Sequence, residues 1–410
     1  MRRSKKIWLK GLGCGIVSGV LLCGVGYTIV NERIPFVDDA LVTGESGKKL
    51  STIETIIDKY YYQEVDKDIL EEYMYYGVMM GLQDRYSGYY SAEQYADAMQ
   101  SSEGVYVGIG LLMEQDPQTN VISVSKCYEG SPAYEVGILA GDIIYKVNEY
   151  IAAEKTLSEL GEIISAEESV VLYIQRDGVE ELMEMEVSIE EVEVPSVYHR
   201  MLNDSMGYIQ IAEFTDVTSE QFRSAYEALS KQGMKGLMID LRENPGGLLS
   251  SVCNTLRQIL PEGLIVYMED KNGKRQEYFC KGETPIEIPL VLLINENSAS
   301  AAEVFSGAVK DYEIGTLVGT TTFGKGIVQQ YFPMYDGSAI KLTVSSYYTP
   351  DGVNIHGVGI APDVEVTWDG EEKFSDPSDY NELSQKEWEK QDNQFEKAVE
   401  VLAELIQQEQ

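Results

Sequence analysis

The sequence predicts an α/β core that is preceded by a smaller β-rich domain, a helical region and an N-terminal membrane helix. Three observations support this. From residue 206 onward, apolar strand patterns alternate with amphipathic helix patterns, which is typical of a largely parallel sheet. Residues 103–188 contain short β runs separated by turns. Residues 11–30 carry no charge, and the 410-residue chain is long enough for several domains.

The composition excludes several classes of function. Lys and Arg number 32 against 68 Asp and Glu, so the formal net charge is −36. A polyanion of this size is a poor candidate for nucleic-acid binding. The chain has only two histidines, and its five cysteines form neither a C-x-x-C pair nor a zinc-binding spacing. We therefore expect no histidine-rich or zinc-type metal site.

The N-terminus is predicted to anchor the chain in a membrane. Residues 1–10 form a basic tail, and residues 11–30 are long enough to cross a hydrocarbon core of about 30 Å as a helix. Basic residues before the apolar run place the tail in the cytoplasm and everything after it outside. A cleaved signal peptide is the alternative, although no A-x-A site follows the run. We expect a single-pass protein of the cell membrane with an extracytoplasmic domain.

The next two segments are a linker and a helical region. Residues 31–49 are polar and contain glycine and proline, which favours a linker. Residues 50–102 are expected to be helical, because apolar side chains such as Ile53, Ile56 and Tyr60 recur at spacings of three and four.

The β-rich domain is predicted over residues 103–188. Its strands are expected at 121–124, 143–147 and 170–174, with turns between them. The acidic stretch 180–193 alternates with apolar residues and is expected to be a last strand that runs into a connector.

The α/β core is predicted over residues 189–368, followed by an acidic linker and a C-terminal helix over 369–410. One face of that last helix is apolar, which predicts that it docks on the core. The helix positions on this face are Phe395, Val399, Leu402 and Ile406. The core strands are expected at 207–211, 237–241, 290–294, 317–319 and 340–348, and the helices at 219–232, 248–260 and about 300–310.

A glycine-containing loop opens the β-rich domain. In the loop Gly108, Ile109, Gly110 and Leu111, successive backbone N–H groups can point to one place, and the glycines permit close approach. Such a loop binds a carboxylate, which makes these residues candidates for peptide binding. The alternative is a β-turn in an unrelated small barrel.

Ser300 is the candidate nucleophile. It follows a buried strand and opens a helix, where the positive partial charge of the helix N-terminus favours an alkoxide and a nearby oxyanion. The alternative is structural, because the run from Ser300 to Glu303 is also a capping-box pattern.

Lys325 is the candidate general base, with Gln329 four residues later as a hydrogen-bond acceptor that could orient it. To act as a base, the lysine must lose about 3 units from a pKa of about 10.4, which requires a mostly apolar site. The alternative is an ordinary solvated loop lysine. The two histidines, His199 and His356, are expected to be structural or exposed.

Two backbone N–H groups are candidate oxyanion donors. One belongs to Gly246, in the strand-to-helix turn 244–247, and the other to Ala301, directly after Ser300. The alternative for the first is a plain turn between a strand and a helix.

Taken together, these motifs resemble the carboxyl-terminal processing proteases, also called tail-specific proteases, from about residue 50 to the end. The β-rich part, with Ser131–Pro132–Ala133 and Ala140–Gly141–Asp142 after the glycine loop, resembles the PDZ domain of bacterial proteases. The other segments that carry the resemblance are 82–87, 240–247, 295–303, 322–326 and 357–363.

The resemblance implies a crotonase/ClpP-like βαβ catalytic core with an inserted PDZ domain. It implies that Ser300 and Lys325 form a serine/lysine dyad, that Gln329 orients the lysine, and that Gly246 and Ala301 hold the oxyanion. Glu303 matches a glutamate beside the family's site. The implied substrates are proteins or peptides with exposed C-termini, the implied mechanism needs no metal or organic cofactor, and the resemblance leaves homo-oligomers open. Two alternatives remain: a non-catalytic peptide-binding scaffold, in which Ser300 is only a helix cap, and a crotonase-like acyl-CoA enzyme.

Overall fold

The structure is a computed structural model that describes residues 44–369 and 392–409. The predicted basic tail and membrane anchor lie outside these residues. Within the two described ranges, no helix has both the length and the apolar character needed to cross a membrane. The chain divides into two compact units, one made of residues up to Ala92 with Gln330–Leu342, and the other of Glu93–Gln329 with Thr343 onward.

Among its described residues, the first unit contains two helices, one short strand and parts of two longer strands. Helix α2 spans Gly44–Tyr60, and α3 spans Lys67–Met80. The carboxylate of Asp66 caps α3 by accepting hydrogen bonds from the first-turn N–H groups. Helix α2 begins at Gly44, inside the segment expected to be a linker. Glycine lowers helix stability without forbidding a helix, and the helical run that follows extends back through these residues.

Strand β1 (Gly88–Tyr90) completes the first unit. It pairs antiparallel with the start of β18 (Ala339–Tyr348). The ring of Tyr89 packs against those of Tyr75 and Tyr76 from α3, with centroids 5.3 and 5.1 Å apart. Aromatic packing therefore joins the helix to the strand.

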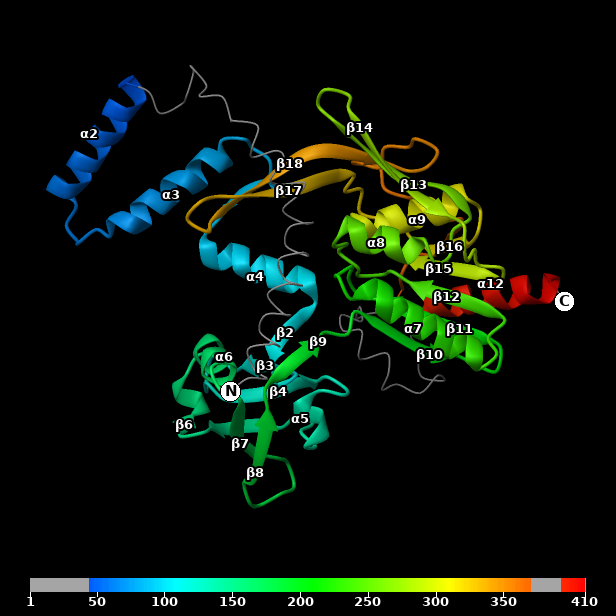
Figure 1. The fold of residues 1–410 in the computed structure, drawn as a ribbon, viewed down its shortest axis with the longest axis horizontal. Coiled ribbons are helices and arrows are strands. Elements are labelled where there is room, and N and C mark those ends of the chain that lie inside the picture. The colour runs from blue at the N-terminus through cyan, green and yellow to red at the C-terminus, as the bar shows by residue number, and fades with distance from the viewer. Residues whose placement is uncertain (1–43, 370–391, 410) are drawn as a thin grey trace, which may run out of the picture. The chain divides into compact units, whose positions relative to one another are not determined.

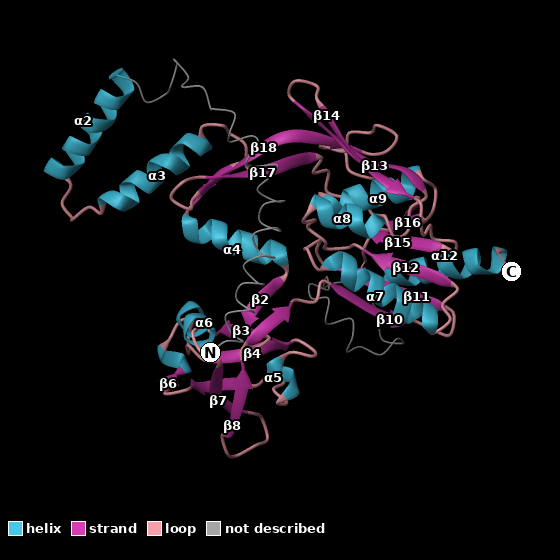
Figure 2. Ribbon diagram, in the orientation of Figure 1, coloured by secondary structure: helices cyan, strands magenta, loops and turns pink. Residues whose placement is uncertain are grey.

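The second unit begins with helix α4 (Ala92–Glu103) and a β-rich module (Figures 1 and 2). The module holds an antiparallel sheet with strand order β3-β4-β5-β7-β8, and the short β6 pairs with β5. Its apolar core is separate from that of the α/β part. The element bounds are β2 Val105–Gly108, β3 Leu111–Gln115, β4 Ile122–Cys127, α5 Pro132–Glu135, β5 Ile143–Val147, β6 Tyr150–Ile151, α6 Leu157–Ser165, β7 Ser169–Gln175, β8 Met183–Ser188 and β9 Glu190–Glu193.

The three strands predicted in this module are present as β4, β5 and β7. The last strand predicted within 180–193 is present as β8, but beyond Ile189 the chain forms a second strand, β9, where a connector was expected. Strand β8 pairs with β7 inside the module, whereas β9 pairs with β2. The two halves have different partners, which the alternating sequence pattern does not reveal.

The α/β part confirms the predicted parallel sheet. Its strand order is β10-β11-β12-β15-β16-β19, in which only the β10–β11 pair is antiparallel. The bounds are β10 Val197–Met201, β11 Met206–Ile211, β12 Gly236–Asp240, β15 Leu290–Ile294, β16 Thr316–Gly319 and β19 Val364–Glu365.

Helices cover both faces of this sheet (Figure 1). On β15, Leu290, Leu292 and Ile294 face the layer of α7 (Thr218–Lys231), α8 (Leu249–Leu256) and α9 (Ala301–Asp311). The alternate residues Val291 and Leu293 face α12 (Asn393–Gln408) on the other side. A strand buried on both faces is apolar throughout, as the sequence of β15 is. The predicted docking of the C-terminal helix is confirmed.

Several elements differ from the sequence prediction. The helix expected to reach residue 260 ends at Leu256, ahead of Pro261. The hairpin of β13 (Glu262–Asp270) and β14 (Arg275–Lys281) was not predicted, nor was β17 (Ile327–Pro333). These strands lie outside the main sheet. The side chains of β14 and β17 are mostly exposed or partly buried and give a weak periodic signal, whereas β13 has a short buried run over residues 265–267 that shows no alternation.

A buried ion-pair network fixes the start of α12. Arg242 forms a charge-assisted pair with Asp240 at 2.8 Å and another with Asp392 at 2.8 Å. Asp392 in turn accepts a hydrogen bond from the N–H of Phe395 at 2.8 Å, which caps the helix. The end of β12 is thereby tied to a helix about 150 residues later in the chain.

We predict that Leu402→Ala lowers the free energy of unfolding of the α/β part by about 2–5 kcal/mol, because Leu402 is fully buried between α12 and the sheet. Urea denaturation followed by tryptophan fluorescence measures this change. Glu404→Ala, at an exposed position of the same helix, is the matched control and should have little effect. Equal stability of the two variants would contradict the docked position of α12.

Candidate active site

The candidate catalytic residues lie where parallel strands end. Gly246 follows β12, Ser300 follows β15, and Lys325 follows β16. Because these strands are adjacent and parallel, their carboxyl ends meet at one edge of the sheet. The topology therefore brings together segments that are about 50 and 25 residues apart in the sequence.

The carboxylate of Glu303 connects the Ser300 and Lys325 segments. Its Oε2 atom accepts hydrogen bonds from the backbone N–H of Ser300 at 2.9 Å and from that of Lys325 at 2.8 Å. Its Oε1 atom accepts from the Thr322 hydroxyl and the Gly324 N–H, both at 2.6 Å. The side chain is fully buried, so all four donors are needed to offset its loss of water.

Ser300 has an unusual backbone conformation. Its φ is 55° and its ψ is −112°, a region that residues with a Cβ atom rarely adopt. The capping box with Glu303 is present through the Ser300 N–H, but the Ser300 hydroxyl makes no cap hydrogen bond to α9. Strain of this kind is concentrated at functional sites. The conformation therefore favours a functional serine over a simple helix cap.

Glycines allow the Lys325 loop to pack backbone to backbone against the turn 356–359. A Cβ atom at Gly326 would lie 2.5 Å from the His356 nitrogen, and one at Gly359 would lie 2.4 Å from the Thr322 carbonyl oxygen. The Gly357 N–H donates to the Gly324 carbonyl at 2.8 Å. This contact explains why the segments 322–326 and 357–363 are both rich in glycine.

Gly246 lies directly against the serine. A Cβ atom at this position would be 2.8 Å from the Ser300 Cβ and 2.9 Å from the Ala301 nitrogen. The two expected oxyanion donors are thus neighbours. The Gly246 N–H, however, donates to Asn244 Oδ1 at 2.8 Å in this conformation. The N–H groups of Ala301 and Gly247 have no acceptor among the residues that the structure describes.

Gln329 lies on β17, and its side chain is partly buried. Its amide nitrogen makes long hydrogen bonds to the Thr343 hydroxyl at 3.4 Å and to the Ile327 carbonyl at 3.5 Å. Lys325 is not among its partners. Gln329 is therefore close to Lys325 in the sequence, but its side chain does not make the hydrogen bond that was expected to orient the lysine.

Tyr347, on β18, is a site residue that the sequence did not reveal. Its hydroxyl donates a hydrogen bond to the Lys325 backbone carbonyl. Burial raises the pKa of the Tyr347 phenol well above its ordinary value, Glu303 raises it further, and the adjacent Ser300 hydroxyl opposes the rise. A neutral phenol therefore lies beside both candidate catalytic residues. Tyr347 falls in an alternating strand, where the pattern indicates only a core position.

Both histidines are exposed. His199 lies on the edge strand β10, and the N–H of His356 donates to Asn354 in a surface turn. The expectation that both histidines are structural or exposed is therefore confirmed.

The glycine loop of the β-rich module has unused donors. The carbonyls of Ile109 and Gly110 accept from Ala133 at 2.9 Å and Tyr128 at 3.0 Å, which turns the loop back on the module. Gly110 has a φ of 85°, and a Cβ atom there would lie 2.1 Å from the Ser131 Cβ. The N–H groups of Ile109 and Gly110 donate to no acceptor in the described part of the chain. The loop thus has the donors of an anion-binding nest.

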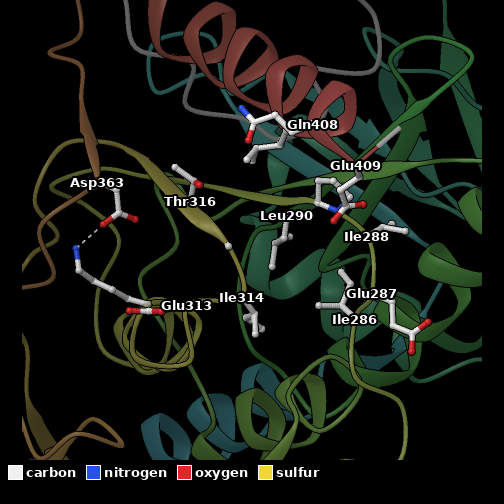
Figure 3. Close-up of a pocket in the computed structure, with 14 residues that line it drawn as sticks. Ile286, Glu287, Ile288, Leu290, Glu313, Ile314, Thr316, Asp363, Gln408 and Glu409 are labelled. Atoms are coloured by element: carbon white, nitrogen blue, oxygen red, sulfur yellow. Dashed lines mark hydrogen bonds and ion pairs between the residues drawn. The ribbon is translucent and has the colours of Figure 1, made fainter.

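A cavity of about 650 Å³ lies elsewhere, at the amino ends of β15 and β16 (Figure 3). Leu290 and Thr316, the first residues of these strands, line it together with Ile286, Ile288 and Ile314. Since Ser300 and Lys325 follow the carboxyl ends of the same strands, this cavity is separate from the candidate catalytic site.

Comparison with known proteins identifies the family. Residues 205–366 match the profile of peptidase family S41. A probable CtpA-like serine protease of Staphylococcus aureus (strain COL) is 33% identical over 377 residues, which cover 88% of this chain and 74% of that protein. The corresponding protein of Staphylococcus epidermidis is 32% identical over 360 residues, which cover 86% and 72%.

Among solved structures, the photosystem II D1 C-terminal processing protease matches with a TM-score of 0.45 and 28% identity, over 77% of this chain and 86% of that one. The sequence relatives alone cover most of the chain and include both strand ends that carry Ser300 and Lys325. The chain therefore belongs to peptidase family S41 and is related to the CtpA-like serine proteases.

Proposed function

We propose that this protein is a membrane-anchored, extracytoplasmic serine endopeptidase that recognises protein C-terminal tails through a PDZ domain and cleaves them with a dyad of Ser300 and Lys325. The proposal rests mainly on the buried Glu303 carboxylate. One of its oxygens accepts hydrogen bonds from the backbone N–H groups of both Ser300 and Lys325. The apolar run at residues 11–30 supports the membrane anchor.

The proposed chemistry follows from these residues. Ser300 Oγ attacks the scissile carbonyl carbon while the neutral Lys325 amine takes its proton. The N–H groups of Ala301 and Gly246 stabilise the tetrahedral oxyanion, for which Gly246 must exchange its bond to Asn244. Lys325 then gives the proton to the leaving amine, and water hydrolyses the resulting ester.

Two features of the β-rich module support the assignment of residues 103–188 as a PDZ domain. Strand β3 is at the edge of its sheet, so an extended peptide can add there as a further strand. The glycine loop directly before β3 presents free N–H groups to which the peptide's C-terminal carboxylate can bind.

One alternative remains. A non-catalytic peptide-binding scaffold on the same fold is favoured by the capping box at Ser300 and by the occupied N–H of Gly246. The acyl-CoA alternative is not supported, because the chain belongs to a peptidase family.

We predict that Ser300→Ala and Lys325→Ala each abolish cleavage of casein by the full-length chain in detergent. The first removes the nucleophile, and the second removes the group that takes its proton. His199→Ala and His356→Ala should cleave at the unmutated rate, because both side chains are exposed. Gel analysis of casein over time measures the rates. Unchanged cleavage in the first two variants would support the scaffold instead.

We also predict that Glu303→Gln lowers kcat by about ten- to a hundredfold with little change in KM. The amide nitrogen of glutamine must face one of four donors, which leaves that donor unpaired and moves the Ser300 or Lys325 segment. Glu227→Gln, on the exposed side of α7, is the control. A rise in KM at constant kcat would show that Glu303 does not position the dyad.

A further inference from the structure

The side chain of Tyr106 covers the glycine loop. Tyr106 lies on β2, two residues before Gly108. A Cβ atom at Gly108 would be only 2.5 Å from Cε2 of the Tyr106 ring, so the ring packs flush against the backbone of the loop. Gly108, Ile109 and Gly110 are all buried. Ile109 packs in the apolar core of the module and Gly110 packs against Ser131, so the ring of Tyr106 contacts the Gly108 end of the loop.

The hydroxyl of Tyr106 faces the unused donors of the loop. It is buried and has no hydrogen-bond partner. Burial raises the pKa of the Tyr106 phenol to about 12, while the backbone N–H groups of Gly110 and Leu111 oppose the rise, which places them next to the oxygen. The chain thus puts a neutral oxygen beside the Gly110 N–H, which has no other acceptor in the described part of the chain.

A neutral phenol oxygen is a weaker hydrogen-bond acceptor for these N–H groups than an ionised carboxylate is. Hydrogen bonds from N–H groups to an ionised carboxylate are roughly twice as strong as those to a neutral acceptor. An incoming C-terminal carboxylate can therefore replace the phenol. An internal peptide segment offers only neutral carbonyl oxygens and gains much less.

A cavity beside Tyr106 offers space into which the displaced ring can move. A cavity of about 600 Å³ is lined by Tyr106 itself and by Val105, Val194 and Pro195. Tyr106 pairs with Val192 in the two-stranded sheet of β2 and β9, which is outside the main sheet of the module. A two-stranded ribbon is weakly held, so the ring can leave without disturbing the module's core.

We propose that Tyr106 is a displaceable internal occupant of the carboxylate-binding loop, which a substrate must expel with its free C-terminal carboxylate. This inference rests on the proposed role of residues 103–188 as a tail-binding domain. It adds a residue that sets specificity, because tails with a free carboxylate displace the phenol and internal segments do not.

The test is a binding measurement on the full-length chain in detergent micelles, with Ser300→Ala present so that the peptide stays intact. The probe is a short fluorescein-labelled peptide that ends in apolar residues, made as the free acid and as the C-terminal amide. Fluorescence anisotropy gives Kd for the chain with Tyr106, for Tyr106→Ala, and for Tyr145→Ala, at an exposed tyrosine of the same module.

Tyr106→Ala removes the ring and its oxygen from the loop. We expect it to tighten binding of the free acid by about two- to tenfold, and to leave the amide unchanged. Tyr145→Ala should leave both unchanged.

Equal or weaker binding of the free acid by Tyr106→Ala would overturn the inference. If the free acid were still preferred over the amide, the proposed tail recognition would stand without it. If no variant preferred the free acid, tail recognition by the loop would fail as well, and this inference with it.

Discussion

The arrangement of the catalytic edge depends on one buried carboxylate. Glu303 lies in the first turn of α9 and accepts four hydrogen bonds from two segments of the chain. Burying a carboxylate is unfavourable unless its oxygens accept hydrogen bonds. Moving a donor segment away would break such a bond and cost about 1–3 kcal/mol for each bond lost, which holds the segment in place. The segments that carry Ser300, the candidate nucleophile, and Lys325, the candidate base, are therefore positioned through their backbones.

The glycines around the site follow from the same constraint. The segments that approach Glu303 and Ser300 must pass within van der Waals contact of each other's backbones. Gly246 against Ser300 and Gly326 against His356 leave no room for a Cβ atom. A motif with a lysine between two glycines thus has a packing reason as well as a catalytic one.

Much of the catalytic edge could be predicted from the sequence. The buried strands β12, β15 and β16 have continuous apolar runs, and the turns after them carry the candidate residues, so the parallel topology alone brings Gly246, Ser300 and Lys325 to one edge. The hydrogen-bond partners could not be predicted in this way. Glu303 was recognised only as a residue beside the site or as a cap, and Asn244 was not recognised as the acceptor for Gly246.

What the sequence missed was long-range and side-chain specific. Tyr347 lies in a strand whose alternation indicates burial, and only the fold shows that its hydroxyl reaches the Lys325 carbonyl. Tyr106 is similar, because an aromatic residue before a glycine loop looks like an ordinary strand residue until the ring is seen against Gly108. In both cases the role depends on which group the tyrosine side chain contacts in the folded protein, and no local sequence pattern contains that information.

The central claim is that Ser300 is activated by Lys325 across the edge held by Glu303. The most direct measurement is covalent labelling of the full-length chain with a fluorophosphonate, followed by peptide mass spectrometry. We predict a single adduct on Ser300, formed more slowly by at least about a hundredfold in Lys325→Ala, because the hydroxyl then lacks its base. An adduct at a different serine, or equal labelling rates in the two proteins, would contradict the claim.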